Sequence, residues 1–555
     1  MSSSTSDVSD PNLVSLLWSL KRALDVAQPG SVPGVTYVHF TLLRKDAEYR
    51  HDLLEKAVRS SDPGIRDLAE RLRAAFLASE TPVGAHGTGA SGAGVSDART
   101  PPAPGRETQG SGRAPRRAGA SFAIILVAAA VLVGVGVLVA TKTGIVDRLT
   151  QIELKGSLVQ DTVLRAGGTY RLMGLVFVEG RATLSIEPGV HILGDPGSAL
   201  IVTRDARLNA RGTAEDPIVF TSAQPVGKRA TGDWGGLVLL GNAPVNTPVS
   251  HIEGLDREDA RGFFGGGVVS DSCGVMQYVR IEYAGYELSK DNELNGLTLG
   301  GCGSGTIVSH VQVHMASDDA IEVFGGSANL DHIVISRAAD DGLDWDRGWT
   351  GYGQFILIQM DPRVGDNGIE ADNQKADHNA SPRSAPTISN LTIIGGGNPG
   401  IVQRAMVLRH GTAGDLRNVL IADLVRDSID IRDASVVEQV KKGSLRFEGL
   451  VFDNPAQVRL FEDESGDAND DAGFDESAFF RGGNLRAAEI TGRLFEGGVS
   501  AGAAALVPQY DDALIRNAAP VPQGEFWDEA ASFIGAVRPG SRASWLDGWT
   551  SFPES

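Results

Sequence analysis

Basic side chains are scarce in most of this 555-residue chain. Acidic side chains outnumber them by 70 to 50, which gives a formal net charge of −20. The first 117 residues hold 15 basic and 13 acidic side chains, a net +2, so the remaining residues carry −22. This imbalance argues against nucleic acid or an anionic membrane surface as a partner of the long C-terminal part, and it favours cations or uncharged glycans.

Aromatic residues and cysteines are also few. Aromatics make up 6% of the chain whereas glycine occurs 69 times, a composition that suits a coil with many corners. The only two cysteines, Cys273 and Cys302, each lie at a turn before an apolar strand pattern. Stacked corners would bring them within disulfide reach, and a bridge would add roughly 3 kcal/mol of stability. The bridge needs an oxidising compartment, and two buried free thiols are the alternative.

No helical stretch interrupts residues 295–372, where one short sequence motif occurs three times. Matching residues of the three copies lie 22 and then 26 positions apart, a spacing typical of repeat folds. Each copy contains an apolar–acid–apolar triplet, and this alternation predicts a strand with one buried and one open face. The triplets are Ile321-Glu322-Val323, Leu343-Asp344-Trp345 and Ile369-Glu370-Ala371.

A second strand pattern follows each triplet, as in Val311-Gln312-Val313 and Ile333-Val334-Ile335. Two or three short strands per repeat, with glycine and asparagine at the corners, predict a mainly β fold, a parallel β-helix over residues 150–555. A leucine-rich horseshoe is the competing fold, but its Leu/Asn consensus is missing. The region Trp527–Trp549 is expected to cap the coil.

Stacked coils about 4.8 Å apart would align acidic side chains that are distant in sequence. Glu322, Asp344 and Glu370 would form one row on the open face, and Asp346 and Asp372 a second row. Like charges in such rows repel, so the patch needs a cation, a basic partner or raised pKa values. We therefore predict a ligand-binding face here, with Ca²⁺ held by Glu322, Asp344 and Glu370.

Other residues near these rows have two interpretations each. Trp349 and Tyr352 are candidates for stacking on a sugar, with loop packing as the alternative. Asp318, Asp319 and Asp341 occupy a corner where aspartates often only accept backbone hydrogen bonds.

Four polar residues share one position of the second strand pattern. They are His310, His332, Asn390 and Asn418. A polar ladder is favoured over a zinc site because no cysteine or third histidine accompanies the pair of histidines.

An acidic loop near the C-terminus resembles a calcium-binding loop. Its side chains are Asp467, Asn469, Asp471 and Asp475. An EF-hand would need glycine at Ala472 and glutamate at Ala478, so the motif is degraded. A solvated acidic loop is the alternative.

The first 150 residues are organised differently. Residues 1–79 have helical patterns at Tyr49–Ser60 and Ile65–Leu77, which predict a small, mostly helical domain that could bind a cytoplasmic protein partner. Residues 80–117 form a Gly/Ala/Pro/Arg-rich linker. Residues 118–140 carry no charge, and a helix of this length covers about 35 Å, enough to span the lipid bilayer. Arginines before the span favour a cytoplasmic N-terminus.

A series of segments occurs in order along the chain: LSIEPGV, GTAEDPIVFTSA, GDWGGLVLLGNAPVN, SDDAIEVFGG and DDGLDWDRGW. Together they resemble the bacterial exported right-handed parallel β-helix proteins of pectate-lyase-like fold, over about residues 165–552. The resemblance implies the fold and export but no particular reaction. Together with the uncharged run of residues 118–140, this predicts a single-pass protein of the bacterial inner membrane, with the coil in the periplasm or extracellular. An internal membrane span in place of a signal peptide departs from the pattern of that family.

Three functions fit these observations. The first is a noncatalytic module that binds a polysaccharide or another cell-envelope polymer with the help of Ca²⁺. The second is an enzyme acting on acidic glycans, because Asp318 and Asp319 resemble the paired aspartates of polygalacturonases and Arg347 is a candidate base for a calcium-dependent lyase. Asp341 is a further catalytic candidate, but the Gly-His-Gly and Arg-Ile-Lys elements of polygalacturonases are missing. The third is a structural stalk.

Overall fold

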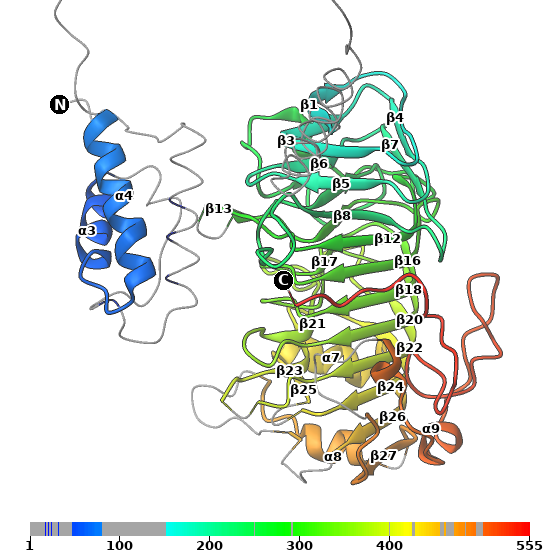
Figure 1. Cartoon of the computed structure of the whole chain (residues 1–555). Coiled ribbons are helices and arrows are strands. Elements are labelled where there is room, and N and C mark those ends of the chain that lie inside the picture. The colour runs from blue at the N-terminus through cyan, green and yellow to red at the C-terminus, as the bar shows by residue number, and fades with distance from the viewer. Residues whose placement is uncertain are drawn as a thin grey trace, which may run out of the picture. The chain divides into compact units, whose positions relative to one another are not determined.

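The computed structural model describes residues 47–79 and 151–554, without residues 249, 290–291, 399, 425–427, 455–459, 462–470, 483 and 496–502, together with Leu17, Leu20, Leu24 and Val32. Residues 151–490 are built around one sheet of 23 strands that winds into a coil (Figure 1). The predicted linker and transmembrane helix, residues 80–117 and 118–140, lie outside the described residues. Within the described ranges, no helix is both long and apolar enough to cross a membrane.

Two helices make up the described part of the N-terminal region: α3 (Ala47–Ala57) and α4 (Pro63–Ser79). Helix α4 begins behind Asp62, whose side chain accepts a hydrogen bond from the Gly64 N–H at 2.7 Å and so satisfies one of the free N–H groups of the first turn. The two helices bury Leu53, Leu54, Ala57, Ile65, Ala69 and Leu72. Both helices lie close to the positions that the apolar periodicity predicts.

The coil is a parallel β-helix with three columns of stacked strands. In the first column the predicted triplets pair in register, so that Leu297, Ile321, Leu343 and Ile369 lie on four consecutive rungs. This column contains the second half of β3 (Thr169–Val178), β6 (Ala199–Val202), β9 (Leu237–Leu240), β15 (Leu297–Gly300), β17 (Ile321–Phe324), β19 (Leu343–Asp346), β21 (Asn367–Asp372), β23 (Arg404–Arg409) and β25 (Ile429–Ile431).

The other two columns are separate in the first coils and become continuous from β12 onward. The second column begins with β2 (Thr162–Leu164), β4 (Thr183–Ile186) and β7 (Arg207–Arg211), and the third with the first halves of β1 (Ile152–Leu158) and β3, followed by β5 (His191–Gly194) and β8 (Ile218–Ser222). The second half of β1 pairs with the second half of β3 in the first column. Both continue in β12 (Gly274–Glu282), β16 (Ile307–His314), β18 (Asn329–Ser336), β20 (Tyr352–Gln359), β22 (Thr387–Ile394), β24 (Gly414–Ala422) and β26 (Leu445–Asp453), and the third ends with β27 (Ala487–Ile490).

Short elements decorate the coil. They are the hairpins β10 (Ser250–His251) with β11 (Phe263–Phe264) and β13 (Glu287–Ser289) with β14 (Asn292–Glu293), and the helices η1 (Ala260–Gly262), α7 (Ala434–Lys442), α8 (Glu476–Arg481), η3 (Ala503–Leu506) and α9 (Ala513–Arg516).

The core follows from the alternation of side chains along each strand. Ile321, Leu343, Trp345 and Ile369 are fully buried inside the coil, and the acid in the middle of each triplet points outward. Each inward side chain packs on those of the rungs above and below, which forms one continuous apolar column. Trp345 stands two residues after Leu343, so the alternation along the strand places it on the same, buried side.

Each long strand from β12 to β24 bends at a single residue with positive φ. We call these residues the bend ladder: Tyr278, His310, His332, Phe355, Asn390 and Asn418, with φ between 50° and 57°. Because the bend turns the chain between two inward-facing positions, the bend residue itself faces outward. The four polar residues predicted to share a column are therefore all in this ladder.

The C-terminal segment, residues 503–554, lies along the bend ladder. Asn418 bonds with the backbone of Ala519, and the Asn390 amide donates to the Phe533 carbonyl at 2.7 Å. Trp545 and Trp549 pack their rings against those of His332 and His310, with centroids 5.0 and 5.8 Å apart. The segment thus runs back along the coil, toward earlier rungs.

This course corrects the prediction that Trp527–Trp549 caps the coil. The end of the apolar column is covered instead by α8, whose Phe480 is fully buried and stacks on Phe461 with ring centroids 5.2 Å apart. The aromatic residues of the C-terminal segment cover the bend ladder because its rings and amides offer stacking and hydrogen-bonding partners on the side of the coil.

The two cysteines form a disulfide between neighbouring coils, with their Cα atoms 5.7 Å apart. The bridge links residues 29 positions apart, and closing a loop of this size stabilises the fold by roughly 3–4 kcal/mol in the chain-entropy model. We expect the Cys273→Ser/Cys302→Ser variant to lose about this much unfolding free energy in denaturant titrations. A reductant should lower the melting temperature of the wild type only. Equal stability of variant and wild type would contradict a stabilising bridge.

Candidate functional site

The stacked triplets align carboxylates on the outer face of the first column. Glu322 pairs with Asp344 between β17 and β19, and Asp344 pairs with Glu370 between β19 and β21. Asp346 and Asp372 end the same strands and form a second row beside the first. The structure therefore places these five acids on adjacent rungs of one face, as the spacing predicts.

A third row lies at the corner that precedes these strands. It contains Asn295, Asp319, Asp341 and Asn367, each two residues before the first apolar residue of a rung. Asp319 accepts a hydrogen bond from the Asp341 N–H at 3.0 Å, and Asp341 accepts from the Asn367 N–H at 2.7 Å. These carboxylates hold the turn of the next coil, which is the structural role considered for Asp319 and Asp341.

Three acids of these rows converge into what we call the carboxylate cluster: Asp319, Glu322 and Asp344. One carboxylate oxygen of each lies within 4.8 Å of the other two. Among the described residues, no lysine or arginine forms an ion pair with any of the three. The cluster therefore concentrates negative charge without a basic side chain in direct contact.

Two buried oxygen atoms at the cluster have no hydrogen-bond partner within the described part of the chain. One is Asp344 Oδ1 and the other is Oδ1 of Asn295, a side chain that is only 5% exposed. The amide nitrogen of Asn295 donates to Glu322 Oε2, so the end of this side chain lies at the cluster. Unpaired buried oxygens are costly, and a cation bound between them would remove that cost.

Burial and mutual repulsion raise the pKa values of these acids. Burial is the main cause for the pKa of Asp319, Glu322 and Asp344, and neighbouring carboxylates raise it further. Burial also raises the pKa of Asp341 to about 9, and that of Asp346 to about 6 against the attraction of Arg347. Without a cation, part of this face therefore holds protons at neutral pH.

At the end of the rows formed by Glu370 and Asp372, side chains of the protein itself neutralise the acids. Arg409 forms ion pairs with Glu370 and, at 3.0 Å, with Asp372, and His410 Nδ1 lies 2.8 Å from Asp372 Oδ2. Burial alone would raise the pKa of Asp372, but the hydrogen bonds from His410 and Arg409 outweigh it and lower the pKa. Burial raises the pKa of Glu370 to about 7 against the attraction of Arg409.

This pairing changes the set of residues that can hold a cation. Sequence spacing selects Glu322, Asp344 and Glu370, whereas the structure pairs Glu370 with Arg409 and brings Asp319 to the other two acids. Arg409 and Asn295 were missed by sequence reasoning. Asn295 could have been found, because it stands two residues before Leu297 as Asp319 stands before Ile321.

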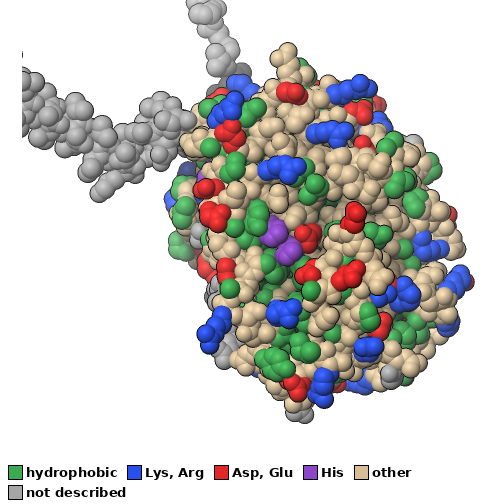
Figure 2. Space-filling model, turned by 90° about the vertical axis from the view of Figure 1, so that its right-hand side faces the viewer, with side chains coloured by type: hydrophobic (Ala, Val, Ile, Leu, Met, Phe, Trp, Pro, Cys, Tyr) green, Lys and Arg blue, Asp and Glu red, His purple; other side chains and the backbone are tan. Residues whose placement is uncertain are grey.

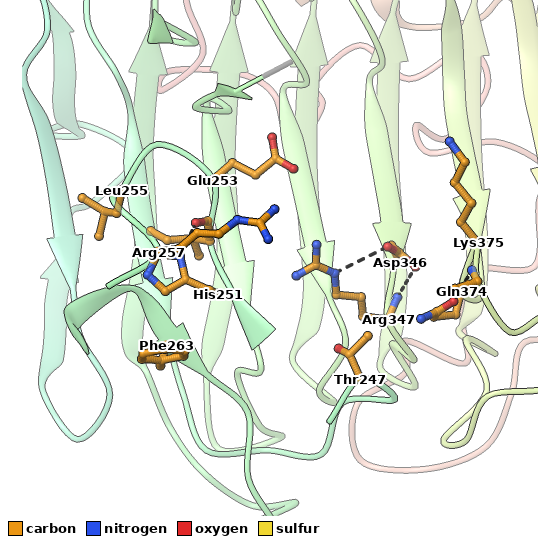
Figure 3. Close-up of a pocket in the computed structure, with 12 residues that line it drawn as sticks. Thr247, His251, Glu253, Leu255, Arg257, Phe263, Asp346, Arg347, Gln374 and Lys375 are labelled. Atoms are coloured by element: carbon orange, nitrogen blue, oxygen red, sulfur yellow. Dashed lines mark hydrogen bonds and ion pairs between the residues drawn. The ribbon is translucent and has the colours of Figure 1, made fainter. Parts of the chain in front are cut away.

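An open pocket of about 690 Å³ adjoins the carboxylate face. Figure 3 shows the side chains of Glu253, Arg257, Arg347 and Lys375 around it. Glu253 and Arg257 come from the loop between β10 and β11, Arg347 follows β19, and Lys375 follows β21.

The pocket and the carboxylate cluster are neighbours on the same face. Asp346, which lines the pocket, lies two residues beyond Asp344 on the same strand, a distance of about 7 Å. The Glu253 charge, at the pocket wall, also contributes to the raised pKa of Glu322. Arg347 lies over the Phe324 ring at 4.4 Å and within 3.6 Å of Asp346, so its guanidinium is held in place beside the opening. Positive side chains thus line an opening next to uncompensated carboxylates.

The two aromatic candidates have different environments. Trp349 is fully buried and donates its indole N–H to the Ala328 carbonyl at 2.9 Å, so the prediction that it stacks on a sugar is wrong. Its apolar ring fills the coil interior beside Trp345. Tyr352 is 43% exposed and packs against Phe526 and Trp527 of the C-terminal segment, away from the residues that line the pocket.

The predicted calcium loop is only partly described. Asp467 and Asn469 lie outside the described residues. The Asp471 side chain accepts a hydrogen bond from the Gly473 N–H, and Asp475 accepts one from the Ala478 N–H at 2.7 Å, which caps α8. Both described acids therefore have local partners of the kind expected in turns and helix caps.

The class of protein defined by this architecture is a parallel β-helix with an outward-facing carboxylate row and an adjoining polar pocket. A family model described as a pectate-lyase like beta helix domain matches residues 156–488, and the chain belongs to this family of right-handed β-helices. No curated protein and no solved structure matches the chain.

Proposed function

We propose that this protein is a noncatalytic polysaccharide-binding module of the bacterial cell envelope. In this proposal a divalent cation, Ca²⁺, binds at the carboxylate cluster of Asp319, Glu322 and Asp344, and an acidic polysaccharide occupies the adjoining pocket. Ca²⁺ favours carboxylate and amide oxygens, which are the donors available here. The main support for this proposal is the buried Oδ1 of Asp344, which has no hydrogen-bond partner among the described residues. Burying such an oxygen destabilises the fold, and a cation bound at the cluster would remove that cost.

The pocket supports an acidic ligand. Arg257, Arg347 and Lys375 line it, and Lys375 forms no ion pair with any described residue. A carboxylate of the polysaccharide would find a cation on one side, at the cluster, and guanidinium or ammonium groups on the other. Such bridging gives affinity without any bond being broken.

The proposal includes the place of the module in the cell. Residues 118–140 anchor the chain in the inner membrane, residues 1–79 lie in the cytoplasm and bind a protein partner there, and the coil lies in the periplasm or outside the cell. The uncharged run of residues 118–140 supports the anchor, and the Cys273–Cys302 bridge supports an oxidising compartment for the coil.

A calcium-dependent lyase is the second candidate. Lys375 and Arg347 beside the cluster are the kinds of base that such a reaction uses to take a proton next to a uronate carboxyl. Hydrolysis has less support, because Asp319 and Asp341 are engaged by backbone N–H groups of the corner. A purely structural stalk would leave the cluster and the pocket without a use.

The test uses the full chain in detergent. We expect Ca²⁺ at 100 times its Kd to raise the unfolding free energy by about 2.7 kcal/mol, and Ca²⁺-dependent retention on immobilised polyuronate. The double variant Glu322→Gln/Asp344→Asn should lose both effects, and Lys375→Ala should lose retention only. Glu438→Gln, an exposed acid on α7, is the matched control and should behave as wild type.

Three outcomes would decide against the proposal. Retention of Ca²⁺ and glycan affinity in the double variant would remove the site. Ultraviolet-absorbing unsaturated products from polyuronate would establish the lyase. The absence of any Ca²⁺ effect and of any glycan retention in the wild type would favour the stalk.

A further inference from the structure

A second group of side chains of the kinds that ligate metal ions lies on a different face, in the bend ladder. Figure 2 shows two adjacent histidine side chains with acidic side chains close by on one long face of the coil. In the bend ladder, His310 and His332 occupy consecutive rungs, on β16 and β18, with their rings stacked 4.3 Å apart and nearly parallel. The carboxylate cluster belongs to the first strand column and does not include either residue.

Asp331 completes this group. One donor atom from each of His310, His332 and Asp331 lies within 4.8 Å of the other two. Sequence reasoning favours a polar ladder over zinc because no third histidine or cysteine accompanies the pair. The structure supplies the third donor from the residue next to His332, because the bend turns two consecutive side chains, Asp331 and His332, outward.

The hydrogen bonding of the group is incomplete. His332 Nδ1 lies 2.7 Å from Asp331 Oδ1, yet the contact lacks the geometry of a hydrogen bond, and this buried nitrogen has no hydrogen-bond partner among the described residues. Ser309 donates to Asp331 Oδ2 at 3.0 Å and lies 2.9 Å from His310 Nδ1, so its hydroxyl orients both groups. A buried ring nitrogen beside a carboxylate without a hydrogen bond indicates a missing ligand.

We propose that His310, His332 and Asp331 bind a divalent transition-metal ion of the zinc type. Two imidazole nitrogens and one carboxylate oxygen are donors that zinc prefers and Ca²⁺ does not, and a fourth position stays open to water. Metal–donor distances of about 2.1 Å place tetrahedral donors about 3.4 Å apart, so the side chains of the group move relative to one another on binding. The side chains of Asp331 and His332 are 31% and 22% exposed, so an ion can reach them from solvent.

The C-terminal segment connects this site to the stability of the fold. Trp545 lies edge-on to His332 and Trp549 to His310. A metal that holds both imidazoles also holds the surface on which these two indoles pack. The same proximity makes the indoles reporters, because Cu²⁺ and Ni²⁺ quench tryptophan emission at short range.

The experiment measures binding of zinc, copper and nickel ions to the full chain purified without a histidine tag. We expect one equivalent of Zn²⁺ in titration calorimetry, and quenching of tryptophan emission by Cu²⁺ that a chelator reverses. Asp331→Asn and His332→Gln should each weaken Zn²⁺ binding at least about tenfold and reduce the quenching. His191→Gln, an exposed histidine on β5 outside the group, is the matched control and should leave both unchanged.

Two further measurements keep the outcome decisive. Circular dichroism and melting curves establish that each variant is folded, and Asp331→Asn preserves shape at a partly exposed position. Glu322→Gln/Asp344→Asn should bind Zn²⁺ as the wild type does, which separates this site from the carboxylate cluster. The proposal is overturned if the wild type binds no Zn²⁺, or if Asp331→Asn and His332→Gln bind it as tightly as His191→Gln does.

Discussion

Replacing Asp344 with asparagine is expected to stabilise the metal-free protein at pH 8 and to abolish its stabilisation by Ca²⁺. Asp344 is surrounded by Glu322 and Glu370, and its buried Oδ1 has no hydrogen-bond partner among the described residues. Asparagine has the same shape and no charge, and its amide can donate to a neighbouring carboxylate. Removal of a buried negative charge from among like charges should give a gain of about 1–3 kcal/mol, the scale of the desolvation cost of one buried polar group, measured by chemical unfolding with chelator present.

The gain should depend on pH in a defined direction. The folded-state pKa of Asp344 is raised above its ordinary value of 3.8, so between the two pKa values the folded state binds more protons than the unfolded state. The contribution of Asp344 to stability is then fully present below about pH 4 and is lost as pH rises. The pKa values of Asp341 and Glu370 are also raised, to about 9 and about 7, so these acids make the folded protein lose further stability as the pH rises through neutrality. The advantage of Asp344→Asn should therefore be small at pH 4 and largest at pH 8.

Asp372→Asn is the matched control, because it removes the same charge from the next rung. Asp372 is paired with Arg409 and His410, and its pKa is lowered. Its contribution is present above its ordinary pKa and lost as pH falls, so this variant should lose about 3–5 kcal/mol at pH 8. Changes of the same sign in the two variants would contradict the division of the rows into an uncompensated end and a neutralised end.

Replacing Trp549 with alanine is expected to loosen the middle of the coil. Trp549 is fully buried, with its ring against those of Tyr278 and His310, and its carbonyl accepts a hydrogen bond from Arg280 at 3.1 Å. Truncation of a buried tryptophan costs about 3–5 kcal/mol. Hydrogen exchange should show the loss of protection on β12, β16 and β18, the rungs under this part of the C-terminal segment.

Phe480→Ala is the comparison for this experiment. Phe480 is equally buried but lies in α8, at the end of the apolar column, so its truncation should expose β25 and β27 instead. If Trp549→Ala loosened the last rungs and spared β12 to β18, the C-terminal segment would act as a cap. The observed packing along the bend ladder predicts the opposite pattern.

Sequence reasoning located the repeat well because strand periodicity is a local property. The alternation in Ile321-Glu322-Val323 and its two counterparts determines which side chains face the core, and the spacing of 22 and 26 residues determines which acids share a face. Trp345 follows the same alternation and is buried. Trp349 lies in the connection after the strand, where alternation no longer applies, and its burial could not be inferred in this way.

The sequence by itself determined the coil, the acidic face and the proximity of the two cysteines, because each depends on a short pattern repeated at a nearly constant interval. Only the tertiary structure decided how the acids are divided between Arg409 and the carboxylate cluster, since Arg409 comes from a coil lengthened by an insertion and its side chain reaches two acids of the neighbouring rung. The tertiary structure also decided the course of the C-terminal segment and the meeting of Asp331 with the two histidines. These depend on side-chain direction at a bend and on contacts between residues more than 200 positions apart, for which the sequence carries no local signal.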